Sequence, residues 1–172
     1  MSSALAQSLQ AALLARQLAP QALAALNDDA CAWTIDLGHG LQAELALQRT
    51  SWSDHQLTLV TATDSAHEPA RWPELDLFAH EMDDLAAPCR LLRFETELGV
   101  SVQGRAEGAS ALGDLAAELV FLQRRTISLL LEPWVMLARG QCSIDEAGLR
   151  VGAAVVQGQG PIPDQLASQE GA

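Results

Sequence analysis

The chain has 172 residues, a formal net charge of −12 and 49% hydrophobic residues. This length and apolar content allow one domain with a buried core, which excludes wholesale disorder. An acidic surface repels phosphate groups and anionic lipid heads, so we expect neither nucleic acid nor a membrane as a partner.

The three cysteines, Cys31, Cys89 and Cys142, lie far apart, and no CxxC motif joins any two of them. The sequence therefore predicts neither a disulfide framework nor a zinc site, and we interpret the thiols as small core residues in a reducing cytosol. The N-terminal segment MSSALAQSLQAALLAR lacks the charged region of a secretory signal. No apolar run approaches the roughly 18 residues of a membrane span. We expect a cytoplasmic protein.

Residues 3–26 carry apolar side chains at the spacing of an amphipathic helix. Pro20 should end or bend this helix, which leaves residues 21–26 as a short further turn. The stripe includes Leu9, Leu13, Leu14 and Leu18. These leucines are candidates both for core packing and for a groove that binds a partner, and the sequence leaves both open.

Three strands should follow as a meander. Apolar and polar residues alternate in residues 33–37 and again in 41–48, which is typical of half-buried strands joined by the tight Gly38–Gly40 connection. Residues 56–63 are rich in Leu, Val and Thr and predict the third strand.

Pro73 suits the first position of a helix, which we expect to run over residues 73–86 until Pro88 interrupts it. One face of this helix carries an apolar stripe, made of Trp72, Leu75, Phe78, Met82 and Leu85. The stripe is either the face of a dimer or part of the intramolecular core, and the pattern does not distinguish the two.

Between residues 92 and 102 the apolar residues occupy even positions and the polar ones odd positions. Because this parity continues past Gly99, it predicts one long strand with a kink there rather than a hairpin. Ser110 is the expected N-cap of a last long helix that ends at Leu131, before Pro133.

The remaining residues predict a short apolar segment at 134–138 and a hairpin at 144–156 around Ala147-Gly148. We expect residues 1–156 to form a single domain. Residues 157–172 are rich in Gly, Gln and Pro and are expected to be disordered.

No GxSxG, HExxH or phosphate-loop motif is present. His80, Asp83 and Asp84 lie close together on the second helix, but an acidic solvated face explains them more simply than a metal site. We therefore expect no enzyme, no metal and no cofactor. A hydrolase or transferase with a site assembled across the fold is the alternative left open.

The order of a helix, a three-strand meander, a second helix, more strand and a final long helix resembles the class I type III secretion chaperones. The stretches that carry the resemblance are AWTIDLGHGLQAELALQ, HQLTLVTATD, WPELDLFAHEMDDL, LLRFETELGVSVQ and SALGDLAAELVFLQRRTISLLLEP, within residues 3–131. In that family a turn usually separates two strands before the last helix. Residues 132–172 extend beyond its usual end.

The resemblance implies an α+β fold, an antiparallel sheet flanked by helices, that needs no cofactor. It also implies a homodimer whose second helix and neighbouring strand form the interface, with Trp72, Leu75, Phe78, Met82 and Leu85 as the helix residues. Patches on the first helix and sheet would hold the N-terminal segment of an effector protein and keep it competent for secretion. The candidate contacts are Leu9, Leu13, Leu14, Leu18, Trp33 and Trp52. The alternative is an adaptor or structural subunit of a bacterial secretion assembly that binds a folded partner.

Overall fold

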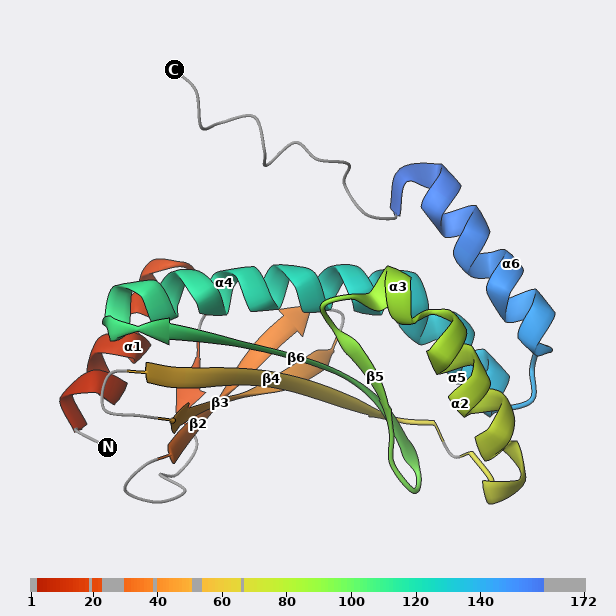
Figure 1. The fold of residues 1–172 in the computed structure, drawn as a ribbon, viewed down its shortest axis with the longest axis horizontal. Coiled ribbons are helices and arrows are strands. Elements are labelled where there is room, and N and C mark those ends of the chain that lie inside the picture. The colour runs from red at the N-terminus through yellow and green to blue at the C-terminus, as the bar shows by residue number, and fades with distance from the viewer. Residues whose placement is uncertain are drawn as a thin grey trace.

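The computed structural model describes residues 3–18, 20–22, 30–38, 40–50, 54–65 and 67–159. Within these residues, six strands form one antiparallel sheet in the order β1-β2-β3-β4-β6-β5 (Figure 1). The expected α+β class, an antiparallel sheet flanked by helices, is confirmed.

The strands are β1 (Gln21–Ala22), β2 (Ala30–Gly38), β3 (Leu41–Arg49), β4 (Asp54–Asp64), β5 (Arg90–Arg93) and β6 (Glu97–Glu107). The helices are α1 (Ser3–Ala15), α2 (Trp72–Glu81), α3 (Asp83–Ala86), α4 (Gly108–Thr126), α5 (Glu132–Ala138) and α6 (Ile144–Ala154). Single turns complete the fold: the 3₁₀ turn η1 (Pro69–Arg71) and the π-helical turns η2 (Ile127–Leu131) and η3 (Val155–Gln159).

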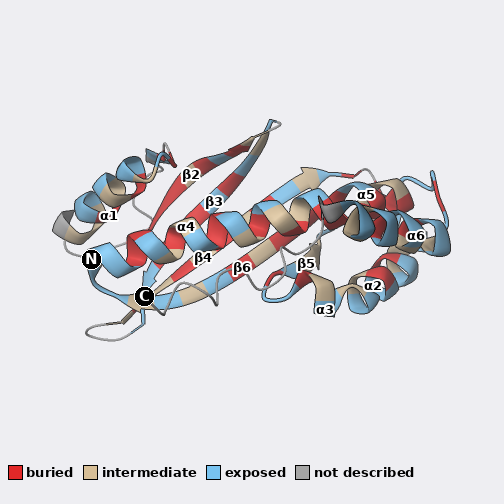
Figure 2. Cartoon of the chain, turned by 90° about the horizontal axis from the view of Figure 1, so that it is seen from above, coloured by how far each residue is buried: buried red, intermediate tan, exposed pale blue. Residues whose placement is uncertain are grey.

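The meander β2-β3-β4 is confirmed, and its alternation divides the sheet into two faces. Trp33, Leu45, Leu59 and Val102 lie opposite one another across four strands, and all are buried. The long helix α4 covers this face, and α1 packs against α4 (Figures 1 and 2). This layer is the first hydrophobic core.

The end of the first helix differs from the expectation. Helix α1 ends at Ala15, and Gln17 takes a left-handed backbone with φ of 61°. Of the turn predicted at 21–26, residues 21 and 22 are not helical, and residues 23–26 lie outside the described residues. Residues 21 and 22 pair instead with Thr34 and Trp33 as the short edge strand β1. The chain therefore leaves the helix before Pro20 and enters the sheet directly after it.

The predicted continuous strand over 92–102 is wrong. β5 and β6 pair as a hairpin in which Arg93 lies opposite Leu98, and the Phe94 amide donates to the Glu97 carbonyl (2.9 Å). Gly99 is not a kink. A Cβ added there would lie 2.5 Å from the Thr61 carbonyl oxygen, so glycine allows β4 to approach.

The predicted stop at Pro133 and the predicted hairpin at 144–156 are also wrong. Helical backbone continues from α4 through the π turn η2 into α5, with Pro133 in its first turn. Residues 144–154 form the helix α6, which begins with a capping box between Ser143 and Glu146. Residues 155–159 continue as the turn η3. Residues 160–172, the rest of the predicted tail, lie outside the described residues.

The chain returns through α5 and α6 to cover α2, and this contact forms a second core. Its buried residues include Leu75 and Phe78 from α2 and Leu130, Trp134 and Val151 from the returning segment. The indole Nε1 of Trp134 donates to the Leu75 carbonyl (3.3 Å).

The stripe predicted as a possible dimer face is thus intramolecular core at Leu75 and Phe78. The neighbouring members Trp72, Met82 and Leu85 are half-buried, and Met82 and Leu85 pack against the same core. The helix also breaks at Met82, which separates α2 from α3.

Two adjacent residues of α2 test this burial. Phe78→Ala should lower the free energy of unfolding by about 3–5 kcal/mol, because it leaves a cavity in the second core. Leu77→Ala is the matched control, since the Leu77 side chain is 48% exposed, and it should cost less than about 1 kcal/mol. Urea unfolding measures both. Equal losses for the two variants would contradict the placement of α2.

Candidate partner-binding surface

The structure separates the six predicted partner-binding residues. Leu9, Leu13, Leu18 and Trp33 are buried in the first core, so they are not available to a partner on the surface of this fold. Leu14 is 55% exposed on α1. Trp52 lies outside the described residues. For Leu9, Leu13 and Leu18, the core-packing interpretation is the one that holds, and Trp33, expected only as a partner contact, is also core.

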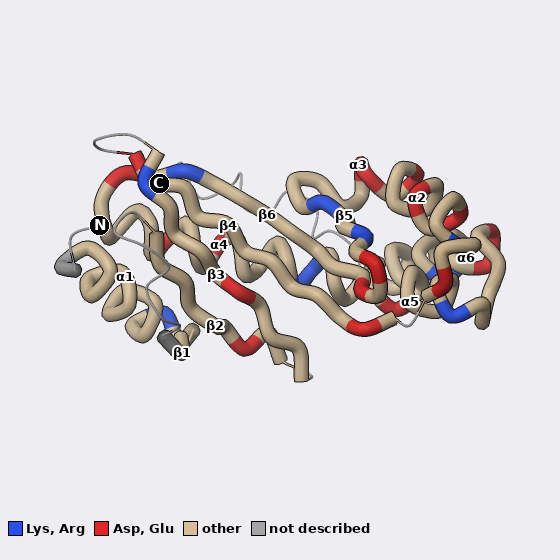
Figure 3. Tube along the Cα trace, turned by 90° about the horizontal axis from the view of Figure 1, so that it is seen from below, with Lys and Arg blue, Asp and Glu red and all other residues tan. Residues whose placement is uncertain are grey.

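The surface left accessible is the second face of the sheet, which no described helix covers (Figures 1 and 3). We call it the open face, defined by cross-strand neighbours of β2, β3, β4 and β6 that point away from α4. Its central members are Thr34, Glu44, Ala46, Gln56, Thr58, Val60, Ser101 and Gln103, each half-buried or exposed. The buried Ala32 and the exposed, charged Asp36 and Arg105 lie on the same face.

Most of the side chains on the open face are small or uncharged. Hydroxyls at Thr34, Thr58 and Ser101 and the amides of two glutamines act as both donors and acceptors. Gln56 Nε2 donates to Gln103 Oε1 across β4 and β6 (3.0 Å). Such side chains can satisfy the peptide groups of an extended chain laid across them, while Ala46 and Val60 offer apolar contact.

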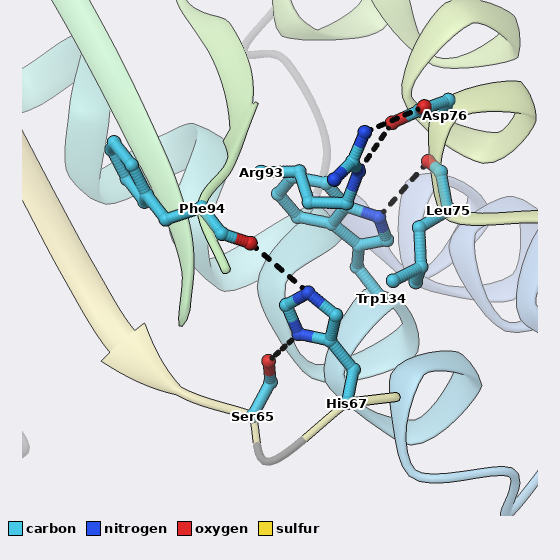
Figure 4. A network of polar contacts seen from close by, with 7 residues as sticks. All are labelled: Ser65, His67, Leu75, Asp76, Arg93, Phe94 and Trp134. Atoms are coloured by element: carbon cyan, nitrogen blue, oxygen red, sulfur yellow. Dashed lines mark hydrogen bonds and ion pairs between the residues drawn. The ribbon is translucent and has the colours of Figure 1, made fainter. Parts of the chain in front are cut away.

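A polar network joins the β5–β6 hairpin to the end of β4 (Figure 4). His67 Nε2 lies 3.1 Å from the Phe94 carbonyl, which can only accept, so Nε2 is the donor. In the neutral ring Nδ1 then accepts from the Ser65 hydroxyl at 2.6 Å. The Ser65 amide also donates to the Thr96 carbonyl (3.1 Å). The network therefore ties the end of β4 to the hairpin turn.

A serine beside a histidine invites a catalytic interpretation, but the geometry of this pair is that of a structural clamp. Ser65 is 0% exposed and His67 is 5% exposed. A nucleophile must reach its substrate, and this hydroxyl is buried against the Thr96 carbonyl of the hairpin. The cysteines offer no alternative nucleophile, because burial raises the pKa of Cys31 to about 11 and raises the pKa of Cys89 and of Cys142.

Arg93 holds the same hairpin against α2. Its guanidinium donates to both carboxylate oxygens of Asp76, at 2.7 and 2.9 Å, and lies 4.3 Å from the centre of the Trp72 ring. The hydrogen bond from Arg93 lowers the pKa of the Asp76 carboxyl.

Sequence reasoning missed one buried polar anchor under α4. Gln123 is fully buried, and its Nε2 donates to the Val100 carbonyl of β6 (2.7 Å) and approaches the Leu59 carbonyl of β4 (3.4 Å). Val120, Gln123 and Thr126 follow one another at a spacing of three residues, and all three are buried. This helical spacing would have predicted from the sequence that Gln123 is buried. The hydrogen bond of Gln123 holds α4 on the covered face.

No known family model, curated protein or solved structure matches this chain. Among the described residues, no group of three or more His, Cys, Asp or Glu side chains is placed to hold a metal ion. In the same part of the chain, no helix is both long enough and apolar enough to span a membrane.

Removal of the His67 ring should loosen the hairpin. His67→Ala removes a buried ring and leaves the part-buried Phe94 carbonyl without its donor, so we expect a loss of about 1–3 kcal/mol in the free energy of unfolding. His80→Ala removes an exposed ring from α2 and should change stability by less than about 0.5 kcal/mol. If His67→Ala unfolds at the same urea concentration as the His80 variant, the clamp has no energetic role.

The ion pair of Asp76 predicts a defined pH dependence. Because the folded pKa lies below the unfolded value of about 3.9, the ionised carboxylate stabilises the fold above that pH. The contribution is lost as the pH falls through the folded pKa. The Asp76 side chain is 56% exposed, which limits the effect to less than about 1 kcal/mol.

Asp76→Asn should therefore destabilise the protein at pH 7, and its difference from the wild type should shrink as the pH approaches 3. Asp84→Asn removes an exposed charge from the neighbouring helix α3 and is the control, with no loss expected at pH 7. Urea unfolding across the pH series checks the prediction. A difference that grows toward acid pH would reverse the assigned sign.

Proposed function

We propose that the protein is a chaperone of the class I type III secretion kind, which holds an extended N-terminal segment of an effector protein on the open face. The observation that carries the proposal is an antiparallel sheet whose second face is left uncovered by the described helices and carries hydrogen-bonding side chains. We no longer propose the first helix as the main binding surface, because Leu9, Leu13 and Leu18 are buried.

The element order supports the proposal further. The hairpin β5–β6 places a turn between two strands before the long helix α4, which is the arrangement usual in that family. The alternation of apolar and polar residues over 92–102 had predicted one continuous strand, which would have departed from that arrangement. The order helix, meander, helix, hairpin and helix is therefore complete over residues 3–126 of the described chain.

The chemistry of the open face suits an unfolded rather than a folded ligand. An extended segment brings unpaired peptide groups, and hydroxyl and amide side chains can pair with them whatever the sequence of the segment. Ordering such a segment costs about 2–5 kcal/mol, so contacts along several strands must act together. The face extends across β2, β3, β4 and β6, which provides this length.

The homodimer stays a prediction, without the interface first expected for it. Leu75 and Phe78 are covered by α5 and α6 of the same chain. A dimer through α2 would require these two helices to move away, and that would expose the second core to water.

Substitution of Thr58 at the centre of the open face tests the proposal. The tagged chain first recovers its partners from the native cytosol, and the N-terminal segments of the recovered secreted proteins are then made as peptides. Thr58→Arg should weaken their binding at least about tenfold, because a long charged side chain blocks the face. Isothermal titration calorimetry measures the affinity.

Ala111→Arg adds the same charge on the exposed side of α4 and should bind as the wild type does. Equal affinity of both variants would place the segment elsewhere. If only intact folded partners bind, and their N-terminal segments do not, the protein is an adaptor of a secretion assembly instead.

A further inference from the structure

A groove lies along the side of α6 away from its buried residues Ala147 and Val151, and the proposed function does not use it. Its volume is about 820 Å³. The lining residues are Glu81 at the end of α2 and, from α6 and the following turn, Ile144, Asp145, Gly148, Leu149, Gly152, Ala153, Val156 and Gln157. These positions follow one face of the helix over about 20 Å at 1.5 Å per residue.

The floor of this α6 groove is apolar and unpartnered in the described chain. Leu149 is 75% exposed and Val156 is 87% exposed, the largest values among the big hydrophobic side chains. Along the same lining, a Cβ added at Gly148 or at Gly152 would meet nothing within 4 Å. Glycine weakens a helix relative to alanine, and here it leaves a hollow into which a second helix can pack closely.

The rim of the groove is acidic. Glu81 and Asp145 line it, and Asp83 and Asp84 of α3 lie at the same end of the molecule (Figure 3). Within the described ranges, none of these four carboxylates has an ion-pair partner. Arg150 is the single basic residue of α6. Carboxylates beside an exposed apolar floor create a negative potential at a place where an apolar ligand can bind.

This charge selects among the possible occupants. The C-terminal residues 160–172 contain Asp164 and Glu170 and no basic residue, so this segment brings like charge to the rim. A second copy of the chain brings the same carboxylates, at a net charge of −12. Both pairings are disfavoured by repulsion, whereas Lys and Arg side chains of a partner complement Glu81 and Asp145.

We infer that the α6 groove binds a basic amphipathic helix of a partner protein. Its apolar side chains pack against Leu149 and Val156, its backbone approaches over Gly148 and Gly152, and its basic residues pair with the acidic rim. The inference stands apart from the proposed function, since it uses another surface and a helical rather than an extended ligand.

The test uses the full chain and a labelled peptide of about fourteen residues, made of leucine and lysine with the leucines on one helical face. Fluorescence anisotropy gives the affinity. Gly152→Leu fills the hollow without a change in charge and should weaken binding at least tenfold. It also raises helix propensity, so circular dichroism should show an intact fold. Phe121→Ala removes an exposed aromatic from α4 and should leave the affinity unchanged.

Three results would overturn the inference. The first is equal affinity of wild type and Gly152→Leu, which means that the peptide is attracted only by the net charge. The second is equal binding of a leucine–glutamate peptide. The third is a wild-type dimer in sedimentation that Gly152→Leu dissociates, because the occupant is then a second copy.

Thr58→Arg keeps the two proposals distinguishable. It lies on the open face and should leave the affinity for the leucine–lysine peptide unchanged, so a failure at one surface says nothing about the other.

Discussion

The apolar stripe of α2 must be kept from water, and the sheet cannot cover this stripe. The buried face of the sheet is already occupied by α4, which contacts β4 and β6 along its length. The chain resolves this by returning through α5 and α6, which place Trp134 and Val151 against Phe78 and Leu75. The position of α6, and with it the groove on its outer side, follows from the need to keep these side chains from water.

That return path sets the backbone of the last helices. A helix that ended at Leu131 would leave α2 uncovered, so the chain continues through Pro133 with a π turn immediately before it. Proline lacks the amide that an α-helix needs in its interior, but it is tolerated in a first turn. The turn η2 therefore allows one helical segment to contribute to both cores. Its residue Leu130 belongs to the second core, and Val120 of the preceding helix α4 belongs to the first.

The sequence predicted what depends on local periodicity and missed what depends on distant contacts. The alternation in β2, β3 and β4 predicted which residues are buried, because a half-covered sheet has a strict period of two. The turn at residues 94–96 was missed because no glycine, proline or asparagine marks it and the even-odd parity continues through it. For α6, the pair Ala147-Gly148 suggested a hairpin, although the capping box of Ser143 and Glu146 was a readable helix signal.

The resemblance implied a binding patch on the sheet, but neither the uncovered face with its residues nor the α6 groove was identified from sequence, for different physical reasons. Thr58 and Val60 read as the solvated side of a strand, and that this whole face stays uncovered depends on where α1 and α4 pack. His67 is brought to Phe94 only by the fold, since 27 positions separate them. The groove required a helix at residues 144–154 that the sequence had assigned to strands.

The two proposed surfaces belong to different cores, and this has a consequence for how a partner would be held. The open face is backed by the first core and the α6 groove by the second, and Figure 1 shows α6 beyond the end of the sheet, on the side of α4. A partner with both an extended segment and a basic helix would engage the second site intramolecularly once the first is bound. Linked contacts of this kind raise the overall affinity by about 10²–10⁴ when the linker spans both sites. Neither contact then has to be strong, which allows release when one of them is disrupted.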